Sequence, residues 1–373
     1  MKIIFSTDQI YLHGGLENVM AQKANYFSEV LNYDVYILTT EQNQKPACYS
    51  LSPNIKLIDI NINYIRTKSY VTKDNLKKMF VHYRKWNQIM KDINPDVLIV
   101  CNQAFDMFWT PFQFSTVLKI REFHSSRCFE ETVRIKGGFF QKIKFMITDF
   151  VESKFDKLIL LNRDEQAFYK TKNTFVIPNP IGYQQLKSAL VNKKVIAAGR
   201  IAAVKNFENL IDVWALVVKE EADWNLHIYG QGDEEIINQL KSKIISSGLE
   251  RNIIIQNPTK DIIKTMLEYS IYIMTSHTEC FPMVLLESLS VGLPIVSYDC
   301  PTGPRNIITD GKDGILVENK NTKLLADKIL LLIRNEKKRQ EMGIIAKQNS
   351  CKFSMDIVMQ QWQYLFTQLK NKN

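Results

Sequence analysis

Strand patterns and helix patterns alternate along the 373-residue chain, and no other feature limits its fold so strongly. Short runs rich in Val, Ile, Leu and Tyr precede longer amphipathic segments, as in 2–6 and 16–31. Strands joined by helices run parallel, and the helices then cover both faces of the sheet. The pattern therefore predicts an α/β fold. The expected strands are 2–6, 33–39, 55–61, 96–101, 117–121, 157–161 and 175–177 in the first half, and 195–198, 225–229, 253–256, 271–275, 294–297 and 314–317 in the second.

A break in this alternation divides the chain. Residues 177–182 read Ile-Pro-Asn-Pro-Ile-Gly, and prolines and glycine end regular structure. We therefore expect two Rossmann-like, doubly wound domains, 1–180 and 181–354, with the C-terminal helix 355–373 as a candidate to pack back on the first. Two such domains would face each other across a cleft, and ligands bind at the carboxyl ends of such sheets.

The composition excludes several classes of protein. An apolar fraction of 45% and a charged fraction of 23% are typical of a globular protein. The first apolar run is too short for a signal peptide, and no stretch reaches the roughly 18 apolar residues of a membrane span. The six cysteines form no C-x-x-C pair, which argues against a zinc site and a disulfide framework. We expect reduced thiols, a cytoplasmic protein and no metal, since no D-x-D pair is present.

Positive charge is concentrated in the first half of the chain. Residues 1–188 hold 25 Lys and Arg against 18 Asp and Glu, whereas the remaining residues hold 23 against 21. Within this half, the runs 76–86 and 134–147 mix basic and bulky apolar side chains. Such runs suit a peripheral position on an anionic membrane surface, and they equally suit amphipathic helices that pack on a sheet.

Two glutamates, Glu279 and Glu287, form the strongest candidate site. They flank the apolar sequence Phe-Pro-Met-Val-Leu-Leu, in which Pro282 suits the first turn of a helix. Glu279 would then lie in the loop before this helix, and Glu287 about one and a half turns inside it. Unpaired N–H groups at such a helix end bind phosphate. Those groups would belong to Phe281, Met283 and Val284.

Further candidates lie in loops that follow expected strands. Arg200 and Lys205 can clasp a diphosphate, or they are simply solvated cations. Gly230 would let the backbone approach a ligand closely, and its surroundings are not the nicotinamide fingerprint G-x-G-x-x-G. The segment 301–305 offers donors from Thr302 and Gly303 and a guanidinium from Arg305, unless it is a rigid turn with a surface arginine.

In the first half, Gly14 and Gly15 precede a helix and would hold acceptor or phosphate, or they form a tight turn. His124 follows an expected strand, where a functional histidine facing a cleft would lie. A lone histidine with a structural role is the alternative.

Together these residues resemble the retaining glycosyltransferases of family 4, which have the GT-B fold. The resemblance covers nearly the whole chain and is strongest from about 195 to 318. One departure is Cys280, where the family usually has glycine. The matching residues are Gly14, Gly15, Glu17, His124, Gly199, Arg200, Lys205, Gly230, Gly232, Glu279, Glu287, the run Thr302 to Arg305, and Asp310, Gly311 and Gly314.

The resemblance implies transfer of a hexose or N-acetylhexosamine from a nucleoside diphosphate sugar, with UDP as the expected nucleotide and no cofactor. The acceptor would be a surface glycan or a polyprenyl-diphosphate-linked glycan at the inner face of the cytoplasmic membrane. The implied catalytic set is His124, Glu279, Arg200 and Lys205. The implied donor site adds Gly230, Phe281, Pro282, Met283, Val284, Glu287 and Arg305. A non-transferring relative such as a UDP-sugar 2-epimerase is the alternative, and nucleic acid is not an expected partner.

Overall fold

A computed structural model of the protein describes residues 1–69, 71–101, 105–259 and 261–370. The chain forms two compact units. Unit 1 comprises Met1–Ile177 together with Met359–Asn373, and unit 2 comprises Pro178–Val358.

Unit 1 is built on a seven-stranded sheet with the order β3-β2-β1-β4-β5-β6-β7. Every neighbouring pair is parallel, and Lys2 to Thr7 align residue by residue with Asp34 to Thr39. The strands are β1 (Lys2–Thr7), β2 (Asp34–Thr39), β3 (Lys56–Asp59), β4 (Val97–Val100), β5 (Leu118–Glu122), β6 (Lys157–Leu160) and β7 (Thr174–Val176). The helices include α1 (Gly15–Glu29), α2 (Lys73–Ile93), α3 (Asp106–Trp109), α4 (Cys128–Lys136), α5 (Phe139–Glu152) and α12 (Met355–Lys370).

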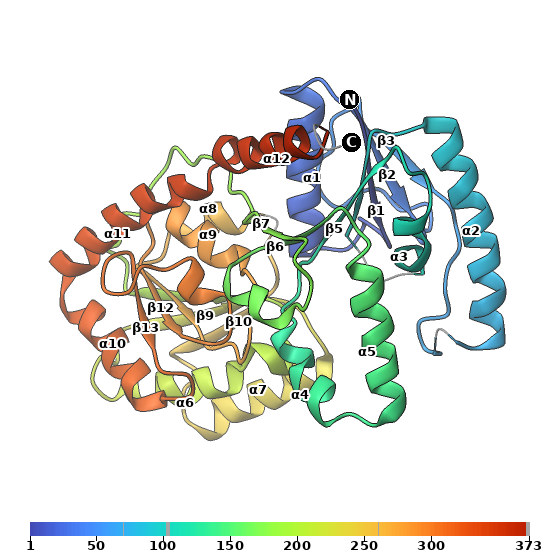
Figure 1. Cartoon of the computed structure of the whole chain (residues 1–373). Coiled ribbons are helices and arrows are strands. Elements are labelled where there is room, and N and C mark those ends of the chain that lie inside the picture. The colour runs from blue at the N-terminus through green and yellow to red at the C-terminus, as the bar shows by residue number, and fades with distance from the viewer. Residues whose placement is uncertain (70, 102–104, 260, 371–373) are drawn as a thin grey trace. The chain divides into compact units, whose positions relative to one another are not determined.

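Side chains that alternate along β1 serve two apolar layers, because successive strand residues point to opposite faces. Ile4 belongs to a buried cluster with Trp86 of α2, whereas Phe5 lies 6.1 Å from Phe27 of α1, measured between ring centroids. The C-terminal helix α12 joins this second layer, and its Trp362 ring lies edge-on to Phe27 at 6.4 Å. Helix α12 thus packs on α1 within unit 1 (Figure 1).

Unit 2 repeats the plan with six parallel strands in the order β10-β9-β8-β11-β12-β13. Helices α6, α7 and α10 lie on one face of the sheet, and α8, α9 and α11 lie on the other (Figure 1). The strands are β8 (Lys194–Ala198), β9 (Asn225–Tyr229), β10 (Ile253–Gln256), β11 (Ile271–Met274), β12 (Ile295–Tyr298) and β13 (Gly314–Val317). The helices are α6 (Phe207–Val218), α7 (Glu234–Ser246), α8 (Ile262–Met266), α9 (Met283–Ser290), α10 (Thr322–Arg334) and α11 (Glu336–Ser350).

All the predicted strands are present, each within two residues of its expected ends. The run 134–147 spans the end of α4 and the start of α5, which Gly137 and Gly138 separate. One local prediction is wrong. Pro282 is the N-cap of α9 and does not lie in its first turn. In the described parts of the chain, no helix has the length and apolar character needed to cross a membrane.

Candidate functional site

The order of the unit 2 sheet reverses between β8 and β11, and ligands of open α/β sheets bind outside the carboxyl ends of the strands at such a point. The loops that follow these two strands meet there. Lys205, from the loop after β8, lies with its Nζ 2.5 Å from Oε1 of Glu279, from the loop after β11. The pair therefore spans the crevice, and both side chains remain partly open to solvent.

The loop that carries Glu279 is held by a dense set of hydrogen bonds. Ser276 Oγ donates to Glu279 Oε1 at 2.7 Å. The backbone N–H groups of Thr302 and Gly303 donate to the Glu279 carbonyl at 2.7 and 2.8 Å, and the Glu279 N–H donates to Pro301 at 2.8 Å. The backbone donors of Thr302 and Gly303 are thus occupied in fixing the glutamate loop, which agrees with the rigid-turn alternative for this segment.

Helix α9 begins directly after this loop and directs its N-terminus into the same region. Its N-cap, Pro282, has no N–H. The N–H groups of Phe281, Met283 and Val284 have no hydrogen-bond acceptor in the part of the chain that the structure describes. Free donors at the positive end of a helix favour a bound anion such as phosphate.

Glu287 lies inside α9 and is only 6% exposed. Burial, with a further contribution from the charge of Asp261, raises the pKa of the Glu287 carboxyl to about 7. Its carboxylate accepts no hydrogen bond from the described residues. A buried acceptor without a partner is suited to ligand hydroxyl groups, which would satisfy it.

Arg200 extends into solvent from the loop after β8, and its guanidinium has no partner among the described residues.

The presence of glycine at position 230 has a structural explanation. A Cβ at Gly230 would overlap the carbonyl of Gly199, so this glycine allows the two loops to touch. This packing is sufficient to explain the glycine, so the predicted contact of Gly230 with a donor stays a prediction.

Arg305 is already engaged. Its Nε and one terminal nitrogen donate to the two carboxylate oxygens of Asp299 at 2.9 and 2.8 Å. This bidentate pair holds the guanidinium in place. A contact between Arg305 and the donor would have to compete with Asp299.

In unit 1, Gly14 is the N-cap of α1 and Gly15 is its first residue. A Cβ at Gly14 would overlap the carboxylate of Glu17, which also accepts a hydrogen bond from Gln9 at 2.6 Å. The overlapping atoms are the flexible end of the Glu17 side chain, so packing alone does not require glycine here. The role of this helix end in holding an acceptor or a phosphate stays a prediction.

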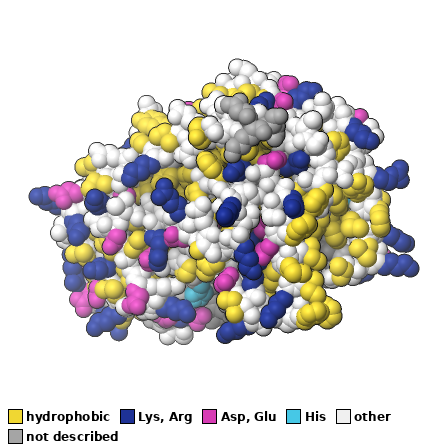
Figure 2. Space-filling model, in the orientation of Figure 1, with side chains coloured by type: hydrophobic (Ala, Val, Ile, Leu, Met, Phe, Trp, Pro, Cys, Tyr) yellow, Lys and Arg dark blue, Asp and Glu magenta, His cyan; other side chains and the backbone are white. Residues whose placement is uncertain are grey.

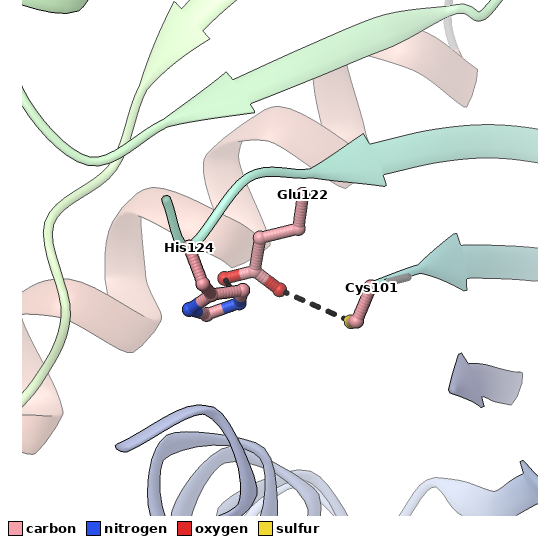
Figure 3. Close-up of side chains that lie close together, drawn as sticks. All are labelled: Cys101, Glu122 and His124. Carbon is pink, nitrogen blue, oxygen red and sulfur yellow. Dashed lines mark hydrogen bonds and ion pairs between the residues drawn. The ribbon is translucent and has the colours of Figure 1, made fainter. Parts of the chain in front are cut away.

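His124 follows β5 by two residues and lies beside Glu122 and Cys101 (Figure 3). Its Nε2 is 3.4 Å from Glu122 Oε1, which is close enough for an ion pair if the imidazole is protonated, although the geometry is not that of a hydrogen bond. Cys101 Sγ donates to the other carboxylate oxygen at 3.6 Å. Lys23 of α1 binds both oxygens of Glu122, and both residues of this pair are almost fully buried.

Cys101, Glu122 and His124 each offer a ligand atom, and these atoms lie within 4.8 Å of one another. A metal ion at this position would meet the ammonium group of Lys23, which is already bound to Glu122. Burial is the first cause that raises the pKa of the Cys101 thiol, and the Glu122 charge is the second. A neutral thiol is a poor metal ligand. The three residues are better described as the surroundings of His124.

Sequence reasoning missed Ser276, Lys23 and Glu122. Ser276 lies three residues before Glu279, close enough in sequence to be considered as its hydrogen-bond donor. Lys23 and Glu122 are 99 positions apart, and nothing local marks them as partners.

Comparisons with known proteins indicate a glycosyltransferase. Residues 183–349 match the family model of glycosyl transferases group 1. An uncharacterized glycosyltransferase of Haemophilus influenzae is 27% identical over 371 residues, which are 97% of this chain and 98% of that protein. A poly(ribitol-phosphate) alpha-N-acetylglucosaminyltransferase of Staphylococcus aureus is 26% identical over 81% of this chain and 61% of its own length.

The fold is shared with solved structures. A variant of TarM from S. aureus, crystallised with fondaparinux, alpha-GlcNAc-glycerol and UDP, matches with a TM-score of 0.77 and 18% identity. The match covers 98% of this chain and 99% of that one. The expected GT-B type of fold, with two parallel-sheet α/β domains, is thereby confirmed.

Proposed function

We propose that the protein transfers a hexose or N-acetylhexosamine from a UDP-sugar to a lipid-linked or surface-polysaccharide acceptor, with retention of anomeric configuration. The observation that carries the proposal is the Lys205–Glu279 pair at the switch point of unit 2, beside the open N-terminus of α9. A cation, free N–H donors and two carboxylates in one crevice match the diphosphate, ribose and hexose of such a donor.

Each group has a role that follows from its chemistry. Lys205 and Arg200 compensate the charge that develops on the leaving diphosphate, and the N-terminus of α9 adds backbone donors. Glu287 accepts the ribose hydroxyls, because its buried carboxylate lacks a partner. Glu279 accepts a hydroxyl of the hexose while Lys205 turns to the phosphate. No cofactor or metal is needed for this charge compensation.

Retention is supported by chemistry and by one relative. UDP-glucose and UDP-N-acetylglucosamine are α-linked donors, and the S. aureus relative is named for an alpha product. In the proposed reaction the acceptor hydroxyl attacks the anomeric carbon on the face that UDP leaves. The leaving phosphate takes the hydroxyl proton as the bond from sugar to phosphate breaks. His124 is proposed to line the acceptor side of the reaction.

A polymer or lipid-linked acceptor is supported by the same relative, whose name gives poly(ribitol-phosphate) as its substrate. An acceptor held at a membrane would place the enzyme on the cytoplasmic side, where UDP-sugars are made. The main alternative, a UDP-sugar 2-epimerase, uses the same donor site without any acceptor.

A ligand screen followed by product analysis tests the proposal. Thermal unfolding with UDP, UDP-glucose, UDP-galactose and UDP-N-acetylglucosamine should show stabilisation, which is about 2.7 kcal/mol at 100 times the dissociation constant. The stabilising donor is then incubated with and without a lipid-linked glycan, and proton NMR identifies the anomer. Sugar transfer with an α linkage is expected. Conversion of the donor to its 2-epimer without acceptor would establish the alternative, and absence of stabilisation by every donor would contradict both.

A further inference from the structure

Helix α5 exposes its apolar side chains, whereas a typical surface helix buries them. Phe139 and Phe140, both in its first turn, are 73% and 85% exposed. Three further large apolar side chains of α5 are exposed, namely Met146, Ile147 and Phe150. At 3.6 residues per turn, 139, 146 and 150 fall on one line, and 140 and 147 lie beside it. The exposed residues therefore form a continuous apolar stripe.

The opposite side of α5 is charged and faces inward. Glu152 is 1% exposed and accepts from the Arg127 guanidinium at 2.6 Å. Asp149 accepts from Arg134 at 2.8 Å, and the Arg134 guanidinium lies 4.3 Å from the centre of the Phe145 ring. These paired charges fix the rotation of the helix, because turning it would expose an apolar ring and separate buried ion pairs.

Two lysines border the apolar stripe. On a helical wheel, Lys142 lies on one side of the line through Phe139 and Lys144 lies on the other. Neither lysine has an acidic partner among the described residues. An apolar stripe with a lysine at each edge is the arrangement of helices that lie in a bilayer interface, where lysine stems cover apolar surface and their ammonium groups reach the headgroups.

The stripe continues onto neighbouring elements of unit 1. Phe112, which is half exposed, stacks on Phe150 with 6.2 Å between ring centroids. Trp109, three residues before Phe112 in the chain, lies edge-on to Tyr83 of α2 at 5.4 Å. Along α2, Phe80 is also exposed. Figure 2 shows the hydrophobic side chains gathered over α5 and toward α2, with Lys and Arg side chains around them.

We propose that this surface docks on an anionic bilayer, with α5 lying in the interface. We define the α5 face as Phe139, Phe140, Met146, Ile147, Lys142 and Lys144. The choice of occupant rests on charge: the face is bordered by unpaired cations, and the acidic residues of α5, Asp149 and Glu152, are held in ion pairs with arginines. Exposed apolar area of this kind marks an interaction site, and anionic headgroups complement the lysines. The proposal does not depend on the reaction, because no residue of the donor site is part of the α5 face.

Sedimentation with vesicles tests this docking. The full chain is mixed with phosphatidylglycerol vesicles and with neutral phosphatidylcholine vesicles, at about 0.1 M and about 1 M salt, where the Debye lengths are about 10 and 3 Å. The wild type should sediment with anionic vesicles at low salt and much less at high salt. Lys142→Glu/Lys144→Glu should weaken binding about five-fold or more for each lysine. Phe139→Ser/Phe140→Ser should weaken it at least ten-fold at either salt concentration.

The matched control is Lys241→Glu/Ile245→Ser, which changes an exposed lysine and an exposed isoleucine on α7 of unit 2. It should bind vesicles as the wild type does. UDP-induced thermal stabilisation, measured on every variant, reports folding and the donor site separately. Wild-type protein that stays in solution with anionic vesicles, or variants that bind as well as the wild type, would overturn the proposal. If the protein does not bind vesicles but forms dimers, and the phenylalanine substitutions dissociate these dimers, the face would be assigned to a second copy instead.

Discussion

The two units place a lysine–glutamate pair near the carboxyl ends of their strands, but in opposite environments. In unit 2, Lys205 and Glu279 are 20% and 13% exposed. In unit 1, Lys23 and Glu122 are 1% and 2% exposed, and an aromatic ring of α12, Trp362, lies 4.8 Å from the lysine nitrogen. The sheets follow the same plan, so burial is the main difference between the pairs.

Burial decides what each pair can do. The Lys205–Glu279 pair can exchange partners with a ligand, because water already screens part of its attraction. The Lys23–Glu122 pair cannot be separated without stranding a charge in the core. Burial would raise the pKa of Glu122, but Lys23 and His124 outweigh it and lower that pKa to about 2. Glu122 therefore stays ionised beside His124.

The largest effect is expected from breaking the buried pair. Lys23→Met should reduce the free energy of unfolding by about 3–5 kcal/mol, because it removes the ammonium group that compensates the buried charge of Glu122. Lys205→Met should cost less than about 1 kcal/mol, since its pair is partly exposed. Urea unfolding of both variants measures this difference. Lys23→Met/Glu122→Gln should recover part of the loss, and equal costs at the two lysines would remove the distinction between the pairs.

The next effect concerns Glu287, the buried glutamate without a partner. Its pKa is raised from 4.5 to about 7, so the folded state holds a proton that the unfolded state releases. The resulting stability is fully present below about pH 4.5 and is lost as the pH rises from there through about 7, a total change of about 3 kcal/mol. Glu287→Gln stays neutral and should lack this loss. Urea unfolding across this range should show that the free energy of unfolding falls with pH in the wild type more than in the variant. An equal pH dependence of the two proteins would contradict the raised pKa.

The sequence determines the fold of this protein to a large extent, because its strands are short apolar runs between clear breaks. Strand β9 (Asn225–Tyr229) has the predicted ends, and helix α12 (Met355–Lys370) begins at the predicted residue. The error lies at the start of α9, where Pro282 is the N-cap and not a first-turn residue. Proline lacks an N–H and suits either position, so the sequence does not distinguish them.

The site was predictable only where its residues are close in sequence. Glu279 and Glu287 flank a helix start, and the distance between them follows from helix geometry. The Lys205–Glu279 pair joins positions 74 apart, and the Arg305–Asp299 pair depends on how a turn folds back. Such contacts come from tertiary packing, and a single sequence carries no periodic signal for them. The roles of Arg200, Lys205 and Glu279 toward a donor stay predictions.

A third effect tests the exposed pair in catalysis. Lys205→Ala and Arg200→Ala should each lower turnover about 100-fold, because each removes a preorganised charge from the leaving diphosphate. Arg305→Ala is the comparison within the same unit. Its guanidinium is held by Asp299, so we expect a loss of only a few-fold. Initial rates with the donor found by the ligand screen measure all three. Near-normal turnover of both Lys205→Ala and Arg200→Ala would remove them from the donor site.

The smallest effect separates the two glutamates. Glu279→Ala should weaken binding of the UDP-sugar by about 1 kcal/mol, the net value of one hydrogen bond. It should not weaken the binding of UDP without a sugar, because Lys205 is then released from its ion pair and remains available to the phosphates. Glu287→Ala should weaken the binding of both ligands, since both carry the ribose. Calorimetric titration of each variant with each ligand measures these four affinities. Equal losses on UDP and UDP-sugar for Glu279→Ala would mean that this carboxylate serves the nucleotide, and that its pairing with Lys205 positions the lysine.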